Sequence, residues 1–463
     1  MSDPMLIVLG LGPYFVAAIL LGFALVAVLP WLLRNPHRWF FFVLLGLNLL
    51  PVGGGDQDGS VFRQVSWSVV FAYAIYLAFR DGDGRWRFPS EVLPWPFVAL
   101  LAYAIMSIAW SAHPVVSAKR LLQLVGVVVV ALAVVRVSQH RSRDLIDQSR
   151  VPIFVFLAIG LLIAVVSPST AFDADHALKA MTTHKNTWGQ FSLLAAIILL
   201  FSLIRSRQRR LFWFLAFILA AASLYLSRSA TSLLAFAAIA AFTIVAMTWK
   251  RGGILGWVAI GTVVGLGLIA VLAYTIVTGK LPFDAIVGAA YSLTGKSDTL
   301  SGRTYLWQLM LAEVSRHWIF GTGYGGFWIS DGMEARAVTS RLNWGPPTQA
   351  HSGYIDVLNE LGVVGLTLLT AVVANHFARL VRLARSGAVE FFFLHLSLMV
   401  SALIINYAES SLLRTTHVWW IILCISILDA HQRCAGIHPG VSRAAARDMR
   451  RPIPIPVPGR AGT

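Results

Sequence analysis

Long apolar segments alternate with short polar connections along the whole chain. Thirteen segments are candidate membrane spans, since about 20 apolar residues are needed to cross the hydrocarbon core. Lipid offers the backbone no hydrogen-bond partner, so such segments are expected to be helices. The segment 39–52 has only 14 residues and could be a half-span, which would reduce the count to twelve. The candidates are 5–33, 39–52, 61–79, 92–110, 120–135, 151–166, 188–204, 211–226, 232–249, 254–277, 354–376, 389–405 and 413–430.

Composition supports this pattern. Of the 463 residues, 57% are hydrophobic and only 13% are charged, against about a quarter in soluble domains, and the mean hydropathy is +0.72. We therefore predict an all-α polytopic membrane protein with 12–13 transmembrane helices. This excludes a soluble enzyme, a disordered chain and a disulfide scaffold. The predicted parts are a transmembrane bundle of about ten spans (1–277), a long loop (278–353), C-terminal transmembrane helices (354–430) and a disordered basic tail (431–463).

The net charge of +16 is explained by topology. One set of alternate connections carries 24 of the 37 basic residues and 8 of the 21 acidic residues, so the whole net charge lies on one side. The positive-inside rule places that side in the cytoplasm, together with the C-terminus, and nucleic-acid binding is not expected. The chain is thus predicted to be a multi-pass membrane protein with a cytoplasmic C-terminus. The connections in the basic set are 34–38, 80–91, 136–150, 205–210, 249–253, 377–390 and the tail from 429.

The long loop of the opposite face, 278–353, is expected to be functional, as long loops in compact proteins usually are. The stretch SGRTYLWQLMLAEVSRHW carries apolar residues near helical spacing, and Ser301 is placed to cap its start. We predict an amphipathic helix lying on the membrane or on the bundle, although it could simply cover helix ends. A glycine-dense stretch, GTGYGGF, follows it.

Four more groups of polar residues fall on this face. They are THKNTWGQ at 183–190, SRSATS at 227–232, AHSGYIDVLNELGVVG at 350–365 and NYAESSLLRTTH at 406–417. All of them lie at span ends, where a helical bundle can gather distant residues into one site. No comparable cluster of mixed chemistry is expected on the cytoplasmic face, and the membrane interior is expected to be nearly free of charge.

Two arginines in these groups oppose local preferences. Arg228 lies in a very short connection on the face that basic residues avoid, and Arg303 is expected in the first turn of a helix, where the macrodipole disfavours cations. Such placement suggests that they grip an anion, because guanidinium groups bind phosphate oxygens bidentately. Anchoring to lipid headgroups is the alternative for Arg228. His184 and Lys185 could add to the grip, or Lys185 could snorkel to the interface.

His351 is the candidate general base, because an imidazole titrates near neutral pH, although a single histidine is often structural. Glu360 and Glu409 lie in or beside apolar segments, where carboxylates tend to be functional. We expect Glu360 to orient another group and His395 to be a satisfied interior histidine. Aromatic residues of the loop could stack on a ligand or form an interfacial belt; they are Trp307, Trp318, Tyr324, Phe327, Trp328 and Trp344.

These motifs together resemble the O-antigen ligase/polymerase superfamily (Wzy/WaaL-like). The resemblance is carried by S-G-R-T-x-x-W, G-T-G-Y-G and A-H-S-G-Y-x-x-x-L-x-E-x-G-x-x-G. The H-K-N-x-x-G box at 184–189 and the N-x-x-E-S-S-L-L box at 406–413 are similar to its exopolysaccharide-polymerase branch, the ExoQ-like proteins. The matches run in order from about 180 to 430, whereas the first 180 residues match only in hydropathy.

The resemblance implies a GT-C-type glycosyltransferase that needs no metal or other cofactor. His351 matches the family's essential histidine, and Arg303 and Arg228 match its diphosphate-holding arginines, with Arg228 in a looser motif. Ser352 replaces the asparagine that the family often has after the histidine. The remaining candidates are expected to contact substrate: His184, Lys185, Asn186, Tyr324, Tyr354 and Glu409.

The favoured function is polymerisation of exopolysaccharide repeat units. It would transfer an undecaprenyl-diphosphate-linked oligosaccharide to another lipid-linked glycan at the periplasmic face, with inversion. The partners implied are these two substrates, membrane lipids, and a chain-length regulator or flippase. An O-antigen ligase acting on lipid A core is the first alternative. A transporter of lipid-linked sugars is the second, but transporters usually place polar groups near the midplane. A non-catalytic assembly factor would not need the two arginines and the histidine on one face.

Overall fold

The protein is described from a computed structural model, which places residues 36–50, 61–79, 93–141, 144–241, 299–329, 332–342, 347–414 and 417–436. Helices dominate these ranges, and the β contact within them is an isolated bridge between Phe172 and Leu178. Five of the described helices are long and apolar enough to cross a membrane, and five shorter ones are also apolar. The predicted all-α polytopic membrane fold is therefore confirmed. The predicted spans 5–33 and 254–277 lie outside the described residues.

The helices before the long loop are α2 (Pro36–Leu49), α3 (Val61–Phe79), α4 (Trp95–Met106) with the 3₁₀ turn η1 (Ser107–Trp110), α5 (Pro114–Arg141), α6 (Leu145–Val166), α7 (Pro168–Ala171), α8 (Lys185–Arg205) and α9 (Arg210–Leu226). A further helix over Ala230–Ala241 is described only in part. The later helices are α12 (Thr299–Val314), α13 (Met333–Thr339), α14 (Gly353–Arg385), α15 (Val389–Ala408) and α16 (Val418–Cys434).

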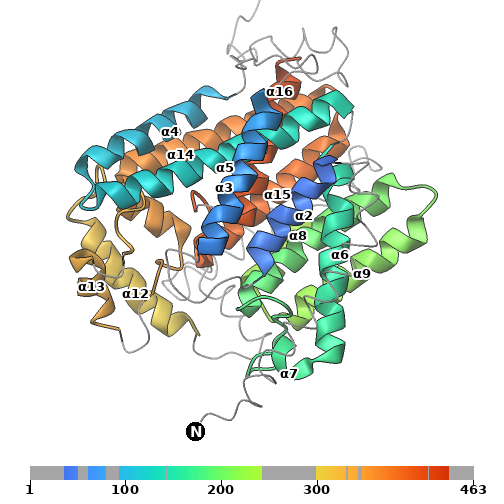
Figure 1. The fold of residues 1–463 in the computed structure, drawn as a ribbon, viewed down its shortest axis with the longest axis horizontal. Coiled ribbons are helices and arrows are strands. Elements are labelled where there is room, and N and C mark those ends of the chain that lie inside the picture. Colours follow the sequence, from blue (N-terminus) through green and yellow to red (C-terminus); the bar gives the residue numbers. More distant parts are fainter. Residues whose placement is uncertain are drawn as a thin grey trace, which may run out of the picture.

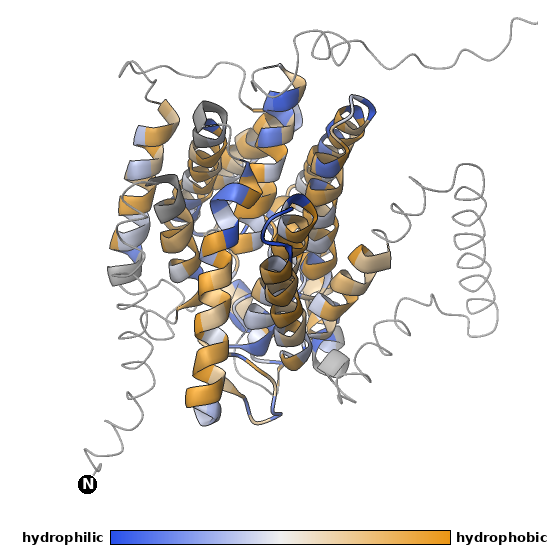
Figure 2. Cartoon of the chain, turned by 90° about the vertical axis from the view of Figure 1, so that its right-hand side faces the viewer, coloured by the Kyte–Doolittle hydropathy of each residue, from blue (hydrophilic) through white to orange (hydrophobic). Residues whose placement is uncertain are grey.

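The helices pack lengthwise around a common core. In Figure 1, α4, α5 and α14 run side by side, and α8 lies among α6, α9 and α15. Hydrophobic residues cover most of each helix in Figure 2, including the outward-facing sides. An outward apolar surface is what a helix needs when its solvent is lipid. The small helices α12 and α13 lie together at one end of the bundle, where α12 packs against α14.

At the other end of the bundle, ion pairs join several of the segments between spans that were predicted to form the basic side. Arg205 at the end of α8 contacts Asp144 before α6 at 2.5 Å and Glu390 in α15 at 3.1 Å. The connections 136–150, 205–210 and 377–390 therefore meet at one end, as the alternation of spans requires. The four polar groups lie at the opposite end, where α8 and α14 begin and α15 ends.

Two predicted boundaries were wrong. The last span does not begin at residue 413, because Leu413 has left-handed backbone (φ 55°) and α16 begins only at Val418. Ser301 does not cap the amphipathic helix, because it lies inside α12, which already includes Thr299. Arg303 is consequently the fifth residue of the described helix, beyond the first turn, so the macrodipole argument for its function is lost. The helix itself is confirmed, and its buried face comprises Leu306, Met310 and Val314.

A break in α14 explains the glycine-dense stretch. Gly362 has left-handed, non-helical backbone (φ 64°, ψ −169°), which frees backbone groups on both sides of it. The segment 318–323 supplies partners: Thr322 N–H donates to Asn359 O at 2.9 Å, and Val363 N–H donates to Trp318 O at 2.8 Å. A Cβ on Gly362 would lie 2.1 Å from the backbone oxygen of Ile319. The break therefore lets the segment 318–323 form hydrogen bonds with the backbone of α14 near the polar end of the bundle.

The interior of the bundle contains a cluster of buried polar groups. Ser426 of α16 is hydrogen-bonded to both His376 Nε2 of α14 (2.9 Å) and His395 Nδ1 of α15 (2.7 Å). Asp429 lies one turn further along α16 and is paired with Arg433 at 2.9 Å. The two histidines are each 1% exposed and Asp429 is 2% exposed, so they join three helices. The expectation that His395 is a satisfied interior histidine agrees with these contacts.

Candidate active site

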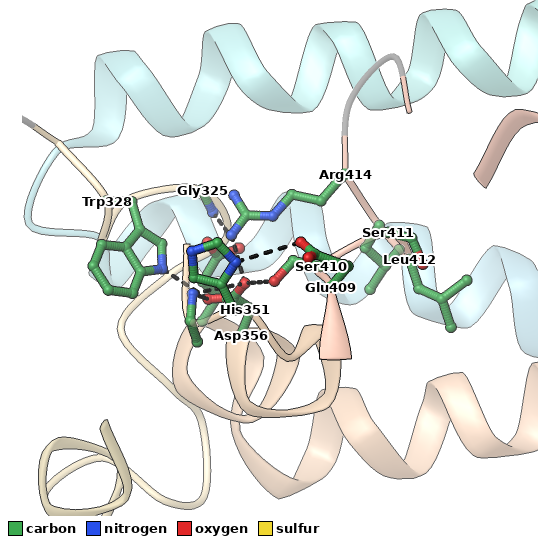
Figure 3. Close-up of polar contacts among 12 residues, drawn as sticks. Gly325, Trp328, His351, Asp356, Glu409, Ser410, Ser411, Leu412 and Arg414 are labelled. Atoms are coloured by element: carbon green, nitrogen blue, oxygen red, sulfur yellow. Dashed lines mark hydrogen bonds and ion pairs between the residues drawn. The ribbon is translucent and has the colours of Figure 1, made fainter. Parts of the chain in front are cut away.

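Glu409 contacts three other predicted site residues, Asn186, Arg303 and His351. It follows the last residue of α15, in extended backbone. Its Oε1 accepts hydrogen bonds from Arg303 Nη2 at 2.8 Å and from Asn186 Nδ2 at 2.7 Å, and its Oε2 lies 3.4 Å from His351 Nδ1. Figure 3 shows the His351 ring and the Glu409 carboxylate facing each other. Residues from three distant motifs therefore meet on one carboxylate.

His351 is held in an uncommon conformation. Its backbone is left-handed (φ 51°), a region that costs a residue other than glycine on the order of 1–3 kcal/mol. The turn ends where α14 begins at Gly353, two residues later. The His351 side chain is 27% exposed, whereas that of Glu409 is 12% exposed, so the imidazole lies between the buried carboxylate and the exterior.

The Glu409 carboxyl is held as a carboxylate. Its burial alone would raise its pKa, but the hydrogen bond from His351 and the charge of Arg303 outweigh that effect and lower the pKa to about 2. Arg303 also donates from Nη1 to the backbone oxygen of Ala408 at 2.8 Å. These two contacts fix the guanidinium in place.

The start of α8 forms a second group beside this carboxylate. His184 caps the helix by accepting from the Asn186 N–H. Lys185 is 4% exposed and its Nζ lies 2.7 Å from Asp175 and 3.1 Å from Asp173. Its charge is already matched by two carboxylates, so the predicted role of Lys185 in gripping an anion lacks support. The ion pairs of Lys185 with Asp173 and Asp175 instead hold the start of α8 in place.

Arg228 lies at the edge of that second group. It is exposed, its backbone is left-handed (φ 48°), and its Nη1 donates to the backbone oxygen of Asp175 at 2.8 Å. Since that partner is a carbonyl, this contact does not itself neutralise the charge of Arg228. Arg228 is therefore joined to Lys185 through Asp175, and Asn186 is the next residue in the chain. No contact between Arg228 and Arg303 is seen among the described residues.

The aromatic residues considered for sugar stacking differ in exposure: Trp318 is 56% exposed and Trp307 is half-buried, whereas three others are buried. Tyr324, Phe327 and Trp328 are at most 3% exposed, and the Tyr324 hydroxyl donates to the Leu413 carbonyl at 2.6 Å. Tyr354 is half-buried, and its hydroxyl donates to the Leu403 carbonyl at 2.9 Å. The rings of Tyr324, Phe327 and Trp328 therefore pack in the interior. Trp344 lies outside the described residues.

Asp356 is the centre of a second polar network, which the sequence did not reveal. Its Oδ1 accepts from Trp328 Nε1 at 2.7 Å and from the Ala350 N–H at 3.1 Å. Its Oδ2 accepts from Arg414 Nη2 at 2.6 Å and from the Ser410 hydroxyl. Figure 3 shows these groups surrounding the Asp356 side chain. Burial opposes the charge of Arg414, yet the neighbouring Asp356 and Glu360 keep the Arg414 pKa above its ordinary value.

Glu360 fixes the glycine-dense stretch, in agreement with the orienting role expected of it. Its Oε2 accepts the Gly325 N–H at 2.9 Å. Arg120 of α5 donates to the carbonyls of Gly325 (2.5 Å) and Trp328 (3.0 Å) on the same stretch. Asp356 falls on an unspecified position of the A-H-S-G-Y-x-x-x-L motif, and Arg414 is the residue that follows the N-x-x-E-S-S-L-L box. Asp356 and Arg414 matter because of the residues that they contact, and spacing along the chain does not predict those contacts.

The class of protein is therefore a polytopic membrane protein with a polar site at one end of its bundle. Comparison with known proteins agrees with the predicted resemblance. Residues 215–370 match the family model described as O-Antigen ligase. The chain is 29% identical over 293 residues to the exopolysaccharide production protein ExoQ of Rhizobium meliloti (strain 1021). That match covers 61% of this chain and 64% of the relative, slightly less than two thirds of the latter. The resemblance to the O-antigen ligase/polymerase superfamily, on the ExoQ-like side, is confirmed.

Proposed function

We propose that this protein is a membrane glycosyltransferase that polymerises exopolysaccharide repeat units at the periplasmic face of the bacterial inner membrane. The donor is an oligosaccharide on undecaprenyl diphosphate, and the acceptor is the sugar hydroxyl of another lipid-linked repeat. The observation that carries the proposal is the convergence of His351, Arg303 and Asn186 on Glu409. A base and a cation fixed on one buried carboxylate suit a reaction that moves a proton and releases an anion.

His351 acts as the base. With Nδ1–H donated to Glu409, the Nε2 lone pair is the acceptor for the proton of the attacking hydroxyl. That oxygen forms a bond to the anomeric carbon while the bond from this carbon to the diphosphate oxygen breaks. Glu409 stabilises the imidazolium that results. Attack opposite the leaving group inverts the anomeric centre.

Arg303 and Arg228 stabilise the leaving diphosphate. Its negative charge grows as the bond breaks, so fixed cations stabilise the transition state more than the ground state. Arg303 is fixed by Ala408 and Glu409, and the guanidinium of Arg228 is exposed on the α8 side of the same end. Two arginines thereby take the place of a divalent metal ion, and the reaction is metal-independent.

The same chemistry serves an O-antigen ligase, with lipid A core as the acceptor. The family model that matches residues 215–370 is described as O-Antigen ligase, which keeps this second function open. The ExoQ relative and the H-K-N and E-S-S-L-L boxes favour the polymerase. The two functions differ in the acceptor and not in the residues that perform the transfer.

Purified full-length protein incubated with lipid-diphosphate-linked repeats and EDTA tests the proposal. We expect a ladder of longer lipid-linked glycans on a gel, which is lost in Arg303→Ala and kept in Arg316→Ala, a control on the α12 side of the loop with an exposed side chain. Transfer only after addition of lipid A core would replace the polymerase by the ligase. Absence of both products with intact donor lipid would contradict the transferase.

A further inference from the structure

The Asp356 carboxylate is hydrogen-bonded to two segments, the one that carries His351 and the one that carries Glu409. Asp356 accepts the N–H of Ala350, the residue before His351, with both oxygens at 3.1 and 3.3 Å. It also accepts the hydroxyl of Ser410, the residue after Glu409. Asp356 itself lies in the first turn of α14 and is 4% exposed.

The hydrogen-bond acceptor positions of the Asp356 carboxylate are filled. The Asp356 carboxylate receives donors from Trp328, Ala350, Ser410 and Arg414, and an ionised carboxylate has about four lone-pair sites. Arg414 supplies the positive charge that makes burial of the Asp356 carboxylate tolerable, with an Nη2–Oδ2 distance of 2.6 Å. The donors come from three segments: the stretch that holds Trp328, the turn before α14 that holds Ala350, and the connection between α15 and α16 that holds Ser410 and Arg414. A shift in any one segment is therefore resisted by the other two.

The site needs such a restraint. His351 has left-handed backbone, and a strained conformation persists only when its surroundings over-determine it. The distance between His351 Nδ1 and Glu409 Oε2 is 3.4 Å, at the outer limit of a hydrogen bond. A small displacement of either segment would break this contact, and misplacement of a reacting group by 1 Å costs about 10²-fold in rate.

We propose that Asp356, with its counter-ion Arg414, is a positioning residue that sets the geometry of His351 against Glu409. The expected effect of Asp356 on the rate of transfer rests on the proposed function. Its expected effect on the orientation of the His351 imidazole rests on the contacts alone. Asp356 takes no part in bond making. It acts through the Ala350 N–H and the Ser410 hydroxyl, which fix the chain on either side of the two functional side chains.

The interior of the same bundle provides a matched control. Asp429 is also a buried aspartate, 2% exposed and paired with Arg433 at 2.9 Å, but it lies near the far end of α16, and within the described ranges its contacts do not include the site residues. Asp356→Asn and Asp429→Asn therefore remove the same charge from similar surroundings. Ser410→Ala is a milder variant that removes a single tie should Asp356→Asn fail to fold.

The test combines kinetics with a readout that needs no turnover. We expect Asp356→Asn to lower kcat by about 10² with little change in KM for the donor, and Ser410→Ala to lower kcat less. Asp429→Asn should leave kcat near wild type. In parallel, ¹⁵N NMR of labelled histidine, assigned with His351→Gln, should show one tautomer of His351 in the wild type and a mixture in Asp356→Asn.

Equal losses of kcat in Asp356→Asn and Asp429→Asn, or an unchanged His351 tautomer in Asp356→Asn, would overturn the positioning role. If the wild type transfers no glycan but the tautomer of His351 changes in Asp356→Asn alone, the proposed function fails and the positioning role stands. The two claims are thereby tested separately.

Discussion

The Nδ1 of His351 lies 3.4 Å from the Oε2 of Glu409, although 58 positions separate the two residues. The other oxygen of the same carboxylate accepts from Arg303 and Asn186. The candidate base and the candidate diphosphate-binding cation are therefore coupled through one side chain. This coupling makes Glu409 the residue whose replacement affects the most functions at once.

Replacing Glu409 by Gln should lower kcat by about 10²–10⁴-fold, the usual contribution of a positioned base. Glutamine keeps the size of the side chain but loses the charge that stabilises an imidazolium. Donor binding should weaken far less, since Arg303 keeps its bond to the Ala408 carbonyl. Steady-state kinetics with a defined lipid-linked donor measures both quantities. A variant with wild-type kcat would contradict the role given to Glu409.

Arg303→Lys preserves the positive charge and removes the fork that bonds both Ala408 and Glu409. Loss of one hydrogen bond to a charged group costs about 1.5–3 kcal/mol, so we expect transfer to slow by roughly 10–100-fold. Arg316→Lys is the matched control, because Arg316 lies just beyond the same helix, is 65% exposed and pairs with Glu313. Comparable rates for the two variants would count against a special role for Arg303.

The pH dependence of stability should report the same carboxylate. The pKa of Glu409 is lowered to about 2 from an ordinary value of 4.5, so the unfolded chain binds the proton more readily. The stabilisation is therefore complete above about pH 4.5 and is lost as the pH falls towards 2. The difference in melting temperature between the wild type and Glu409→Gln should shrink on acidification from pH 6 to about pH 3. A difference that grows over this range would show that the sign is wrong.

The hydropathy pattern predicted the helices well because lipid permits little else. The motifs identified His351, Arg303, Asn186 and Glu409, yet gave no hint that the first three meet on the fourth. That arrangement depends on which helix ends lie side by side in three dimensions.

The contacts of Lys185 and Tyr324 illustrate a limit of reasoning from residue type. Lys185 and Tyr324 have the right chemistry to bind substrate, but Lys185 is neutralised by Asp173 and Asp175, and Tyr324 is buried with its hydroxyl satisfied. Sequence shows which groups a residue offers, and only the fold shows whether those groups are already used. Asp356 was missed for the same reason, since its importance arises entirely from its partners.

The break in α14 should be sensitive to a single methyl group. In Gly362→Ala the backbone (φ 64°, ψ −169°) is in a region that is nearly restricted to glycine and costs other residues about 1–3 kcal/mol. The Cβ would also meet the Ile319 oxygen at 2.1 Å, adding an overpacking cost of about 1–3 kcal/mol. Gly387→Ala is the control, because Gly387 is also left-handed (φ 94°) but nothing lies within 4 Å of its Cβ position. Thermal unfolding in detergent should show the larger loss for Gly362→Ala, and equal losses would argue against the loop contact.

The most direct test of the account is the single-turnover rate of glycan transfer in His351→Ala, measured with EDTA present and donor saturating. The control is His395→Ala, which removes a buried histidine of the same bundle far from the site. The account predicts a fall of about 10²–10⁴-fold for His351→Ala and a rate near wild type for folded His395→Ala. Transfer by His351→Ala within about threefold of wild type, far short of the loss expected for a general base, would contradict the central claim.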